Sequence, residues 1–438
     1  MKISLWLSTF SATKSSAAAT TTPPLHHLSS TTSGGSDNTT SSSLSSSLSS
    51  HNSLQTNLSL QTLPSLPSLQ FQTTTLSLSS PPLSLPSPSP RRRLIASLAL
   101  RHPFLYAASG HHVHVFDLTT NDHTLISTFN HRDPSSGSVK SIAFHGEKIL
   151  TAHQDCKIRL WNKEHELVAT LPTVKDRLRR LVFPKNYVDV RRHKKRLWIE
   201  HHDAVSGLAV ISTGGGLICS VSWDKSLKIW RASDFRCVQS VNKAHDDAIN
   251  AVVVSHDGTI YTASADCLIK VWGIPIGERQ YGPIATLQKH KSAVNALALN
   301  RDGSVLFSGS CDRSILVWER EDSANYMVVT GALRGHTNAI LCLINVSDLL
   351  FSGSADRTVR IWRRGHDGKF CCLTVSEAHE KPVRSLAAAV VDDGGGSTVG
   401  GGVRVFSGSF DGDIKVWEVV GSKVGGDLHS DGFLKLDM

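Results

Sequence analysis

The stretch FSGSADRTVRIW, residues 351–362, decides the fold because it returns in nearly the same form as FSGSCDRSILVW at 307–318 and FSGSFDGDIKVW at 406–417. Each copy places short apolar runs on both sides of a small, polar turn, which is the pattern of a strand-turn-strand hairpin. A unit that recurs along a chain indicates a repeat architecture in which each copy packs against the next. The remaining question is which repeat it is.

The residues around each hairpin recur at fixed spacings. Six aspartates are each followed six residues later by a tryptophan and preceded four residues earlier by a hydroxyl residue, and in five sets a histidine stands 20 to 32 residues before the aspartate. Such side chains can meet through hydrogen bonds across a turn and its flanking strands, and would fix how one sheet packs on the next. The sets are Thr151, Asp155 and Trp161; His202, Ser220, Asp224 and Trp230; His245, Thr262, Asp266 and Trp272; His290, Ser308, Asp312 and Trp318; His336, Ser352, Asp356 and Trp362; and His379, Ser407, Asp411 and Trp417.

This His, Ser/Thr, Asp and Trp set resembles the structural tetrad of the WD-repeat family, and most successive tryptophans lie 42 to 46 residues apart, the period of a propeller blade. The resemblance implies an all-β chain, a seven-bladed β-propeller of four-stranded antiparallel blades over residues 93–422. None of the six tryptophans is followed by the name-giving aspartate. A degenerate first blade has Phe116 for the tryptophan and Gly110 for the aspartate, and the second blade lacks an obvious histidine.

Composition predicts different behaviour outside the ring. Residues 1–92 are rich in Ser, Thr and Pro with one acidic residue, Asp37, so we expect a disordered tail, with an organelle transit peptide as the alternative. A Gly-rich loop is expected at 392–402 and a C-terminal tail at 423–438. A strand from one end should complete the last blade, with LSLQTL (58–63), FQTTTLSL (71–78) and the C-terminal GFLKLD as candidates.

A basic insertion at 171–200 separates the second and third blades and carries net charge +7 of the chain's +9. It can serve as a nuclear import signal or attract nucleic acid, acidic proteins or lipid surfaces, and the alternative is a solvated loop. Interleaved Leu181, Val182, Phe183, Tyr187, Val188, Leu197, Trp198 and Ile199 suggest that it packs along the ring and fixes its cations. The candidate patch for a partner or for import is Arg177, Arg179, Arg180, Lys185, Arg191, Arg192, Lys194, Lys195, Arg196 and Trp198.

The stretch PKNYVDVRRHKKRLWIEHHDAVSGLAV (184–210), with the leader LPSLPSLQ (63–70), is similar to plant JINGUBANG-like WD-repeat proteins. This resemblance implies a non-enzymatic regulatory scaffold in the cytosol or nucleus, in a family linked to pollen germination and tube growth. We expect protein partners, a monomeric ring and, as the alternative function, direct contact of a nuclear protein with RNA or chromatin through the insertion.

Several function classes find no support. A catalytic site is needed once, whereas the Asp, His and Ser set is repeated about once per blade, so we predict no enzyme. Phosphate-binding and dinucleotide-binding glycine motifs are absent, as are paired cysteines at metal-ligand spacing, so no cofactor or metal is expected. No apolar run is long enough to span a bilayer. Eight cysteines without a disulfide-like pattern favour a reducing compartment.

Overall fold

The computed structural model describes residues 76–78, 83–84, 94–119, 123–191, 194–212, 216–321, 327–365, 368–377, 379–391 and 402–421. The chain divides into two units, 1–72 and 73–438, and all described residues belong to the second unit. The predicted tail lies largely outside the described residues, as do residues 392–401 of the predicted Gly-rich loop, the whole of 423–438, and the closing-strand candidates LSLQTL and GFLKLD.

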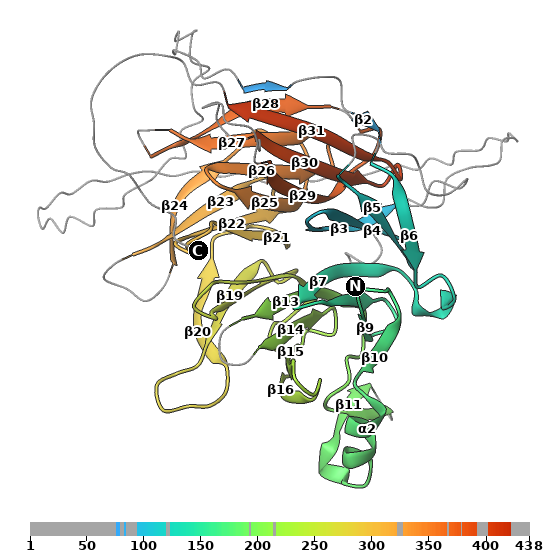
Figure 1. Ribbon diagram of the computed structural model, residues 1–438. Helices are drawn as coiled ribbons and strands as arrows, with labels where there is room; N and C mark the ends of the chain where they lie inside the picture. The colour runs from blue at the N-terminus through green and yellow to red at the C-terminus, as the bar shows by residue number, and fades with distance from the viewer. Residues whose placement is uncertain are drawn as a thin grey trace, which may run out of the picture. The chain divides into compact units, whose positions relative to one another are not determined.

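Seven antiparallel blade sheets follow one another along the described chain, and a separate two-stranded sheet lies between the second and the third (Figure 1). The first strands of successive sheets contact one another in order, and β29 of the seventh sheet contacts β3 of the first, which closes the ring. The predicted seven-bladed β-propeller of four-stranded blades is confirmed. The strands of blades one to three are β3 (Ile95–Arg101), β4 (Phe104–Ser109), β5 (His112–Asp117), β6 (Leu125–Phe129); β7 (Val139–His145), β8 (Lys148–His153), β9 (Ile158–Trp161), β10 (Leu167–Leu171); and β13 (Val205–Ile211), β14 (Leu217–Ser222), β15 (Leu227–Arg231), β16 (Cys237–Val241).

Blades four to six repeat this plan, each as a four-stranded meander. Their strands are β17 (Ile249–Val254), β18 (Ile260–Ser264), β19 (Leu268–Gly273), β20 (Gly282–Gln288); β21 (Val294–Leu299), β22 (Val305–Ser310), β23 (Ile315–Arg320), β24 (Met327–Leu333); and β25 (Ile340–Val346), β26 (Leu349–Ser354), β27 (Val359–Arg364), β28 (Phe370–Ser376). A short 3-10 helix, η2 (Pro134–Ser136), lies between blades one and two.

The seventh blade is assembled from both ends of the ring. Its strands β29 (Val383–Val391), β30 (Gly402–Ser409) and β31 (Ile414–Gly421) come from the C-terminal side. β1 (Leu76–Leu78) and β2 (Leu83–Ser84) pair antiparallel with β31 from the N-terminal side. β1 falls within FQTTTLSL, the one of the three candidate closing segments that reaches into the described residues, and it pairs with the edge of β31. Pairing β31 removes a sheet edge that would otherwise be open.

The FSGS part of the repeated stretch has a packing role in the middle of the three blades that carry it. A Cβ on Gly309, Gly353 or Gly408 would overlap side chains of the next blade, namely Ile340, Val383 and Ile95. Glycine is therefore required because the second strand of one blade approaches the first strand of its neighbour closely. The apolar residues between the blades form successive buried clusters, in which Phe307, Phe351 and Phe406 are almost fully buried.

The basic insertion is folded. It contains α2 (Val174–Leu181), the 3-10 helix η3 (Pro184–Asn186), and a hairpin of β11 (Tyr187–Arg191) and β12 (Lys194–Leu197). Figure 1 shows this green insertion next to β10, at one side of blades two and three. The Thr173 side chain accepts a hydrogen bond from Asp176 N and caps the start of α2.

Candidate functional site

The predicted tetrads of blades four, five and six form complete hydrogen-bonded chains. In blade six, Trp362 Nε1 donates to Ser352 Oγ at 2.8 Å, Ser352 Oγ lies 2.8 Å from His336 Nε2, and His336 Nδ1 lies 2.8 Å from Asp356 Oδ2. The same three contacts, at 2.7 to 2.8 Å, join the members of the other two tetrads, which are Trp272, Thr262, His245 and Asp266, and Trp318, Ser308, His290 and Asp312.

Each tetrad aspartate also organises the turn around it. In blade seven, Asp411 Oδ1 accepts from Asp413 N at 2.9 Å, and Oδ2 accepts from Glu380 N at 3.2 Å and lies 3.0 Å from His379 Nδ1. Burial alone would raise the pKa of this carboxyl, but the contacts with His379 and the backbone N–H groups outweigh burial and hold the pKa at about 2. The aspartate is therefore ionised, and it ties the hairpin turn to the strand that enters the blade.

Ser, His and Asp are hydrogen-bonded in the same order as in the catalytic triad of a hydrolase. The environment of the serine, however, prevents it from acting as a nucleophile. Ser352 is fully buried, and its oxygen already accepts the indole N–H of Trp362. A nucleophile must reach a substrate carbonyl beside donors that stabilise the oxyanion, and a fully buried hydroxyl cannot do so. The repeated set is structural and ties the strands together in the blades that carry it.

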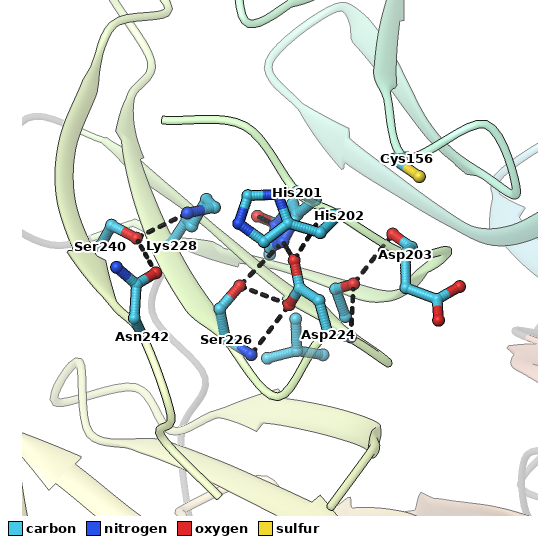
Figure 2. A network of polar contacts seen from close by, with 12 residues as sticks. Cys156, His201, His202, Asp203, Asp224, Ser226, Lys228, Ser240 and Asn242 are labelled. Carbon is cyan, nitrogen blue, oxygen red and sulfur yellow. Dashed lines mark hydrogen bonds and ion pairs between the residues drawn. The ribbon is translucent and has the colours of Figure 1, made fainter. Parts of the chain in front are cut away.

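Blade three corrects one predicted member. The tetrad histidine is His201 and not His202: His201 Nε2 lies 2.8 Å from Ser220 Oγ, and Nδ1 lies 3.1 Å from Asp224 Oδ2 (Figure 2). His202 contributes its backbone N–H to Asp224 at 2.7 Å. Burial lowers the pKa of His201, so the ring is neutral and donates Nδ1–H to the carboxylate. Trp230 Nε1 completes the chain to Ser220 Oγ at 2.9 Å.

Blade two replaces the missing upstream histidine with two residues that sequence reasoning did not identify. His153 Nε2 lies 2.7 Å from Thr151 Oγ1, which also accepts from Trp161 Nε1 at 2.8 Å. Burial lowers the pKa of His153 to about 3, so it is neutral. Arg159 takes the histidine's other role and bonds Asp155 Oδ2 at 2.8 Å and Asp133 Oδ2 at 2.6 Å. No specific sequence signal marks this role of Arg159, because a basic residue stands four positions after the aspartate in four of the other five sets as well.

The tetrad of blade seven is incomplete. His379 Nε2 lies 2.6 Å from Ser407 Oγ, and its Nδ1 reaches Asp411 as described. Trp417 Nε1 is buried but has no hydrogen-bond partner among the described residues. The indole of Trp417 therefore acts as a packing group against Phe351, Val405 and neighbouring apolar side chains.

The basic insertion is fixed to the outer edge of blade three. Asp176, which is fully buried, accepts from Cys237 N at 3.2 Å through Oδ2 and from Arg180 Nε at 3.1 Å through Oδ1. Arg180 Nη2 donates to Cys237 O at 3.2 Å, and its guanidinium lies 4.4 Å from the centre of the Trp198 ring. Cys237 belongs to the outer strand β16, so Asp176 and Arg180 satisfy backbone groups that this edge would otherwise expose.

The structure divides the predicted cationic patch into paired and exposed members. Arg180 is bound at the edge of blade three, Arg177 Nε lies 3.2 Å from Glu200 Oε1, and Arg196 donates to His201 O at 3.4 Å. Exposed side chains are those of Lys175, Arg179, Lys185 and Lys195, the last lying 3.9 Å from Asp189. Arg192 lies outside the described residues, and for Arg191 and Lys194 the backbone alone is described, in β11 and β12.

The apolar residues of the insertion also divide into two groups. Leu197 and Ile199 join the buried cluster between blades two and three, with Tyr187 and Trp198 packed against it. Leu181, Val182 and Phe183, in contrast, are exposed, so the expectation that they pack along the ring is wrong. The insertion is anchored by its C-terminal part and by two polar side chains of α2.

Within the described ranges, no three His, Cys, Asp or Glu side chains gather in a way that could hold a metal ion. Among the helices that the structure describes, none is long and apolar enough to cross a membrane.

The chain is similar to three curated relatives over about half of its length. It is 25% identical over 231 residues to the nuclear distribution protein nudF of Aspergillus niger, covering 52% of this chain and 43% of the relative. It is 27% identical over 198 residues to the ribosome biogenesis protein WDR12 homolog of Drosophila persimilis, covering 41% of each. It is 23% identical over 226 residues to the Target of rapamycin complex subunit wat1 of Schizosaccharomyces pombe, covering 50% and 62%. The matches thus span about half the length of these relatives.

The blade pattern also matches a family model directly. The model for the WD domain, G-beta repeat, matches residues 123–162, 193–231, 235–273, 281–319, 327–363 and 370–418, more than half of the chain. Each match ends one residue after a blade tryptophan, within the strand that carries it or directly after that strand. With its closed ring of seven blades and its repeated tetrads, the chain belongs to the WD domain, G-beta repeat family.

Proposed function

We propose that this protein is a non-enzymatic scaffold that gathers protein partners in the cytosol or nucleus, with the basic insertion as its docking surface. The observation that carries the proposal is the fixed attachment of α2 to Cys237 of blade three while Lys175, Arg179, Lys185 and Lys195 remain exposed. A solvated loop does not need buried hydrogen bonds that hold its cations in fixed positions. A surface that recognises a partner does need its cations to be fixed.

Three further observations support the proposal. One relative is named as a subunit of a complex and another as a ribosome biogenesis protein. All eight cysteines are free, which suits the reducing conditions of the cytosol and nucleus. The similarity of 184–210 to JINGUBANG-like proteins supports placing the scaffold in a plant regulatory pathway, with pollen germination and tube growth as the process to examine first.

The test compares two full-length variants with the same change in charge. One carries Lys175→Gln, Arg179→Gln, Lys185→Gln and Lys195→Gln in the insertion. The matched control carries Lys289→Gln, Lys291→Gln, Arg301→Gln and Arg334→Gln, which are exposed positions elsewhere on the ring. Both are purified with the wild type from plant cells after nuclease treatment, and the bound proteins are identified by mass spectrometry.

We expect one set of proteins to remain with the wild type and the control and to be lost from the insertion variant. Partners retained by all three proteins would overturn the role of the insertion. Partners lost from the wild type on nuclease treatment would favour the alternative, in which the insertion contacts RNA or chromatin. Trp198 gives that alternative little support, since Arg180 already covers a face of the ring on which a base could stack.

A further inference from the structure

The helix α2 is inverted relative to an ordinary surface helix. A surface helix turns its apolar side towards the core and its charged side towards solvent. In α2 the inward positions are Asp176 and Arg180, which lie one turn apart and bind the backbone of Cys237. The polar side of the helix is therefore occupied by blade three, and its apolar side faces away from the ring.

The outward face carries five large apolar side chains. Their exposed fractions are 73% for Val174, 62% for Leu178, 54% for Leu181, 78% for Val182 and 52% for Phe183. Val174, Leu178, Leu181 and Val182 stand at i, i+4, i+7 and i+8, and Val182 keeps helical backbone angles at the C-cap. This spacing lines up one stripe along a helix, the arrangement that packs against a partner helix or groove.

Cations border this stripe. Lys175 and Arg179 lie one turn apart on α2 beside the apolar residues and are exposed. Lys185 Nζ lies 5.9 Å from the centre of the Phe183 ring at the end of the stripe. The three carboxylates of the insertion each pair with a cation of the insertion, Asp176 with Arg180, Asp189 with Lys195 and Glu200 with Arg177. The field beside the stripe is therefore positive.

We propose that the exposed face of α2 docks an acidic amphipathic helix of a partner protein, an inference that rests on the proposed scaffold function. The partner's apolar stripe would cover Val174, Leu178 and Val182, and its carboxylates would meet Lys175 and Arg179. Apolar burial then supplies affinity, while opposite charges at the rim select the partner and speed its approach. The buried contacts of Asp176 and Arg180 hold α2 in place before binding. Little conformational entropy of α2 is therefore lost when the partner helix binds.

The two other acidic partners fit this face less well. Phosphate backbones offer no apolar surface to cover five exposed hydrophobic side chains. An anionic membrane would accept cations and apolar groups together, but binding to lipid scales with the apolar area that is buried, and a helix of 8 residues offers little of it. A short, rigid stripe with flanking cations matches the dimensions of a helix–helix contact.

The test uses the full-length protein and a synthetic probe peptide of about 20 residues, long enough to form a helix, with Leu at alternating spacings of three and four and Glu at most other positions. A second peptide has every Glu replaced by Lys. One variant carries Leu178→Ser and Val182→Ser, and another carries Lys175→Gln and Arg179→Gln. The matched control carries Ile274→Ser and Ile276→Ser, which are exposed by 52% and 106% on blade four. Binding is followed by fluorescence anisotropy.

We expect the acidic peptide to bind the wild type and the blade-four control equally, and each α2 variant to bind about tenfold more weakly. The basic peptide should not bind. Circular dichroism and the thermal midpoint should be unchanged in all variants, because the altered side chains are exposed. The inference is overturned if the acidic peptide fails to bind, or if the Leu178→Ser, Val182→Ser protein binds it like the wild type.

A sedimentation assay with vesicles of phosphatidylcholine and phosphatidylserine separates the membrane outcome. Sedimentation of the wild type that is lost in the Leu178→Ser, Val182→Ser variant, without peptide binding, would assign the face to lipid instead. The proposed function fails separately: it falls if the cellular partners are retained when Lys175, Arg179, Lys185 and Lys195 are neutralised. If the cellular partners require those cations but the acidic peptide does not bind, the scaffold function stands and the proposal of an acidic helix as the ligand of α2 is overturned.

Discussion

The Nζ of Lys228 in blade three lies 2.6 Å from the carbonyl oxygen of Trp198, near the end of the basic insertion. Lys228 is fully buried and also donates to Ser240 Oγ at 2.6 Å (Figure 2). Burial lowers the pKa of its ammonium, and the hydrogen bonds compensate for the lost water. Blade three therefore anchors the insertion at two places: the buried Lys228 binds Trp198, and the backbone of Cys237 at the outer edge binds Asp176 and Arg180.

The substitution Lys228→Met should loosen the insertion. It leaves Trp198 O without its donor, so local opening of residues 174–200 becomes easier. We expect trypsin to cleave within the insertion about fivefold faster, which corresponds to roughly 1 kcal/mol of opening free energy. Lys270→Met is the control, because Lys270 makes the equivalent bond to Ala244 O in blade four. Equal cleavage of the two variants would contradict the anchoring role.

Replacing each of the adjacent histidines of blade three should have different effects. His201→Ala removes the contacts to Ser220 and Asp224 and should lower the free energy of unfolding by about 2 kcal/mol, because buried polar groups lose their partners. His202→Ala retains the backbone N–H that binds Asp224 and should cost under about 0.5 kcal/mol. Urea unfolding measures both, and a larger loss for His202→Ala would refute the assignment.

Arg159 should be the strongest single support of blade two. Its side chain is 5% exposed and bridges Asp133 and Asp155, so Arg159→Met removes the cation from Asp133 and leaves Asp155 with Lys157 alone, 3.8 Å away. We expect a loss of about 3 kcal/mol in the free energy of unfolding. The double variant Arg159→Met, Asp155→Asn should be more stable than the sum of the single variants predicts, since the uncompensated charge at Asp155 is removed. Additive losses would show that the two side chains act independently.

The tryptophans of blades six and seven should respond differently to phenylalanine. Trp362→Phe breaks the hydrogen bond to Ser352 and should cost about 1 to 2 kcal/mol by urea unfolding. Trp417→Phe removes a buried indole N–H that has no partner among the described residues, so the loss should be smaller by about 1 kcal/mol. If both substitutions cost the same, Trp417 also makes a hydrogen bond.

Closure of the ring should depend on residues 76–84. Removing residues 1–92 takes away β1 and β2 and leaves β31 with an open edge, so we expect the thermal midpoint to fall by about 3 °C or more and the protein to self-associate. Removing 1–72 alone spares both strands and serves as the control. Light scattering with size-exclusion chromatography detects the association, and two truncations that behave alike would argue against the role of β1.

Much of the ring could be predicted from the sequence because its determinants are local. The hairpin from Ser352 to Trp362 contains its own turn aspartate, hydroxyl and indole, and the same spacing recurs in other blades. The alternation of apolar residues in the strands and the fixed spacing of Ser/Thr, Asp and Trp do not depend on the loops. The fold class and the number of blades can therefore be predicted by counting the repeats. The tetrads of blades four to six followed in the same way.

The choice between His201 and His202 depended on three-dimensional contacts. The two residues are adjacent, and only the structure shows that the His201 ring reaches Ser220 while His202 gives Asp224 its backbone N–H. His153 was missed because it lies two residues from Thr151 on the same strand, where its side chain shares the buried side.

The sequence by itself determined the repeat, the number of blades, the resemblance to the WD-repeat family and the position of the basic insertion. Each of these depends on residue types at fixed local spacing. The tertiary structure alone decided that β1 pairs with β31 and that α2 turns its apolar side outward. Each of these two features depends on the open edge of a strand that is distant in the sequence: β31 for β1, and β16 for α2. Backbone groups of Cys237 needed partners, and Asp176 and Arg180 supplied them, so hydrogen bonding at a distant edge outweighed the ordinary inward preference of Leu178 and Val182.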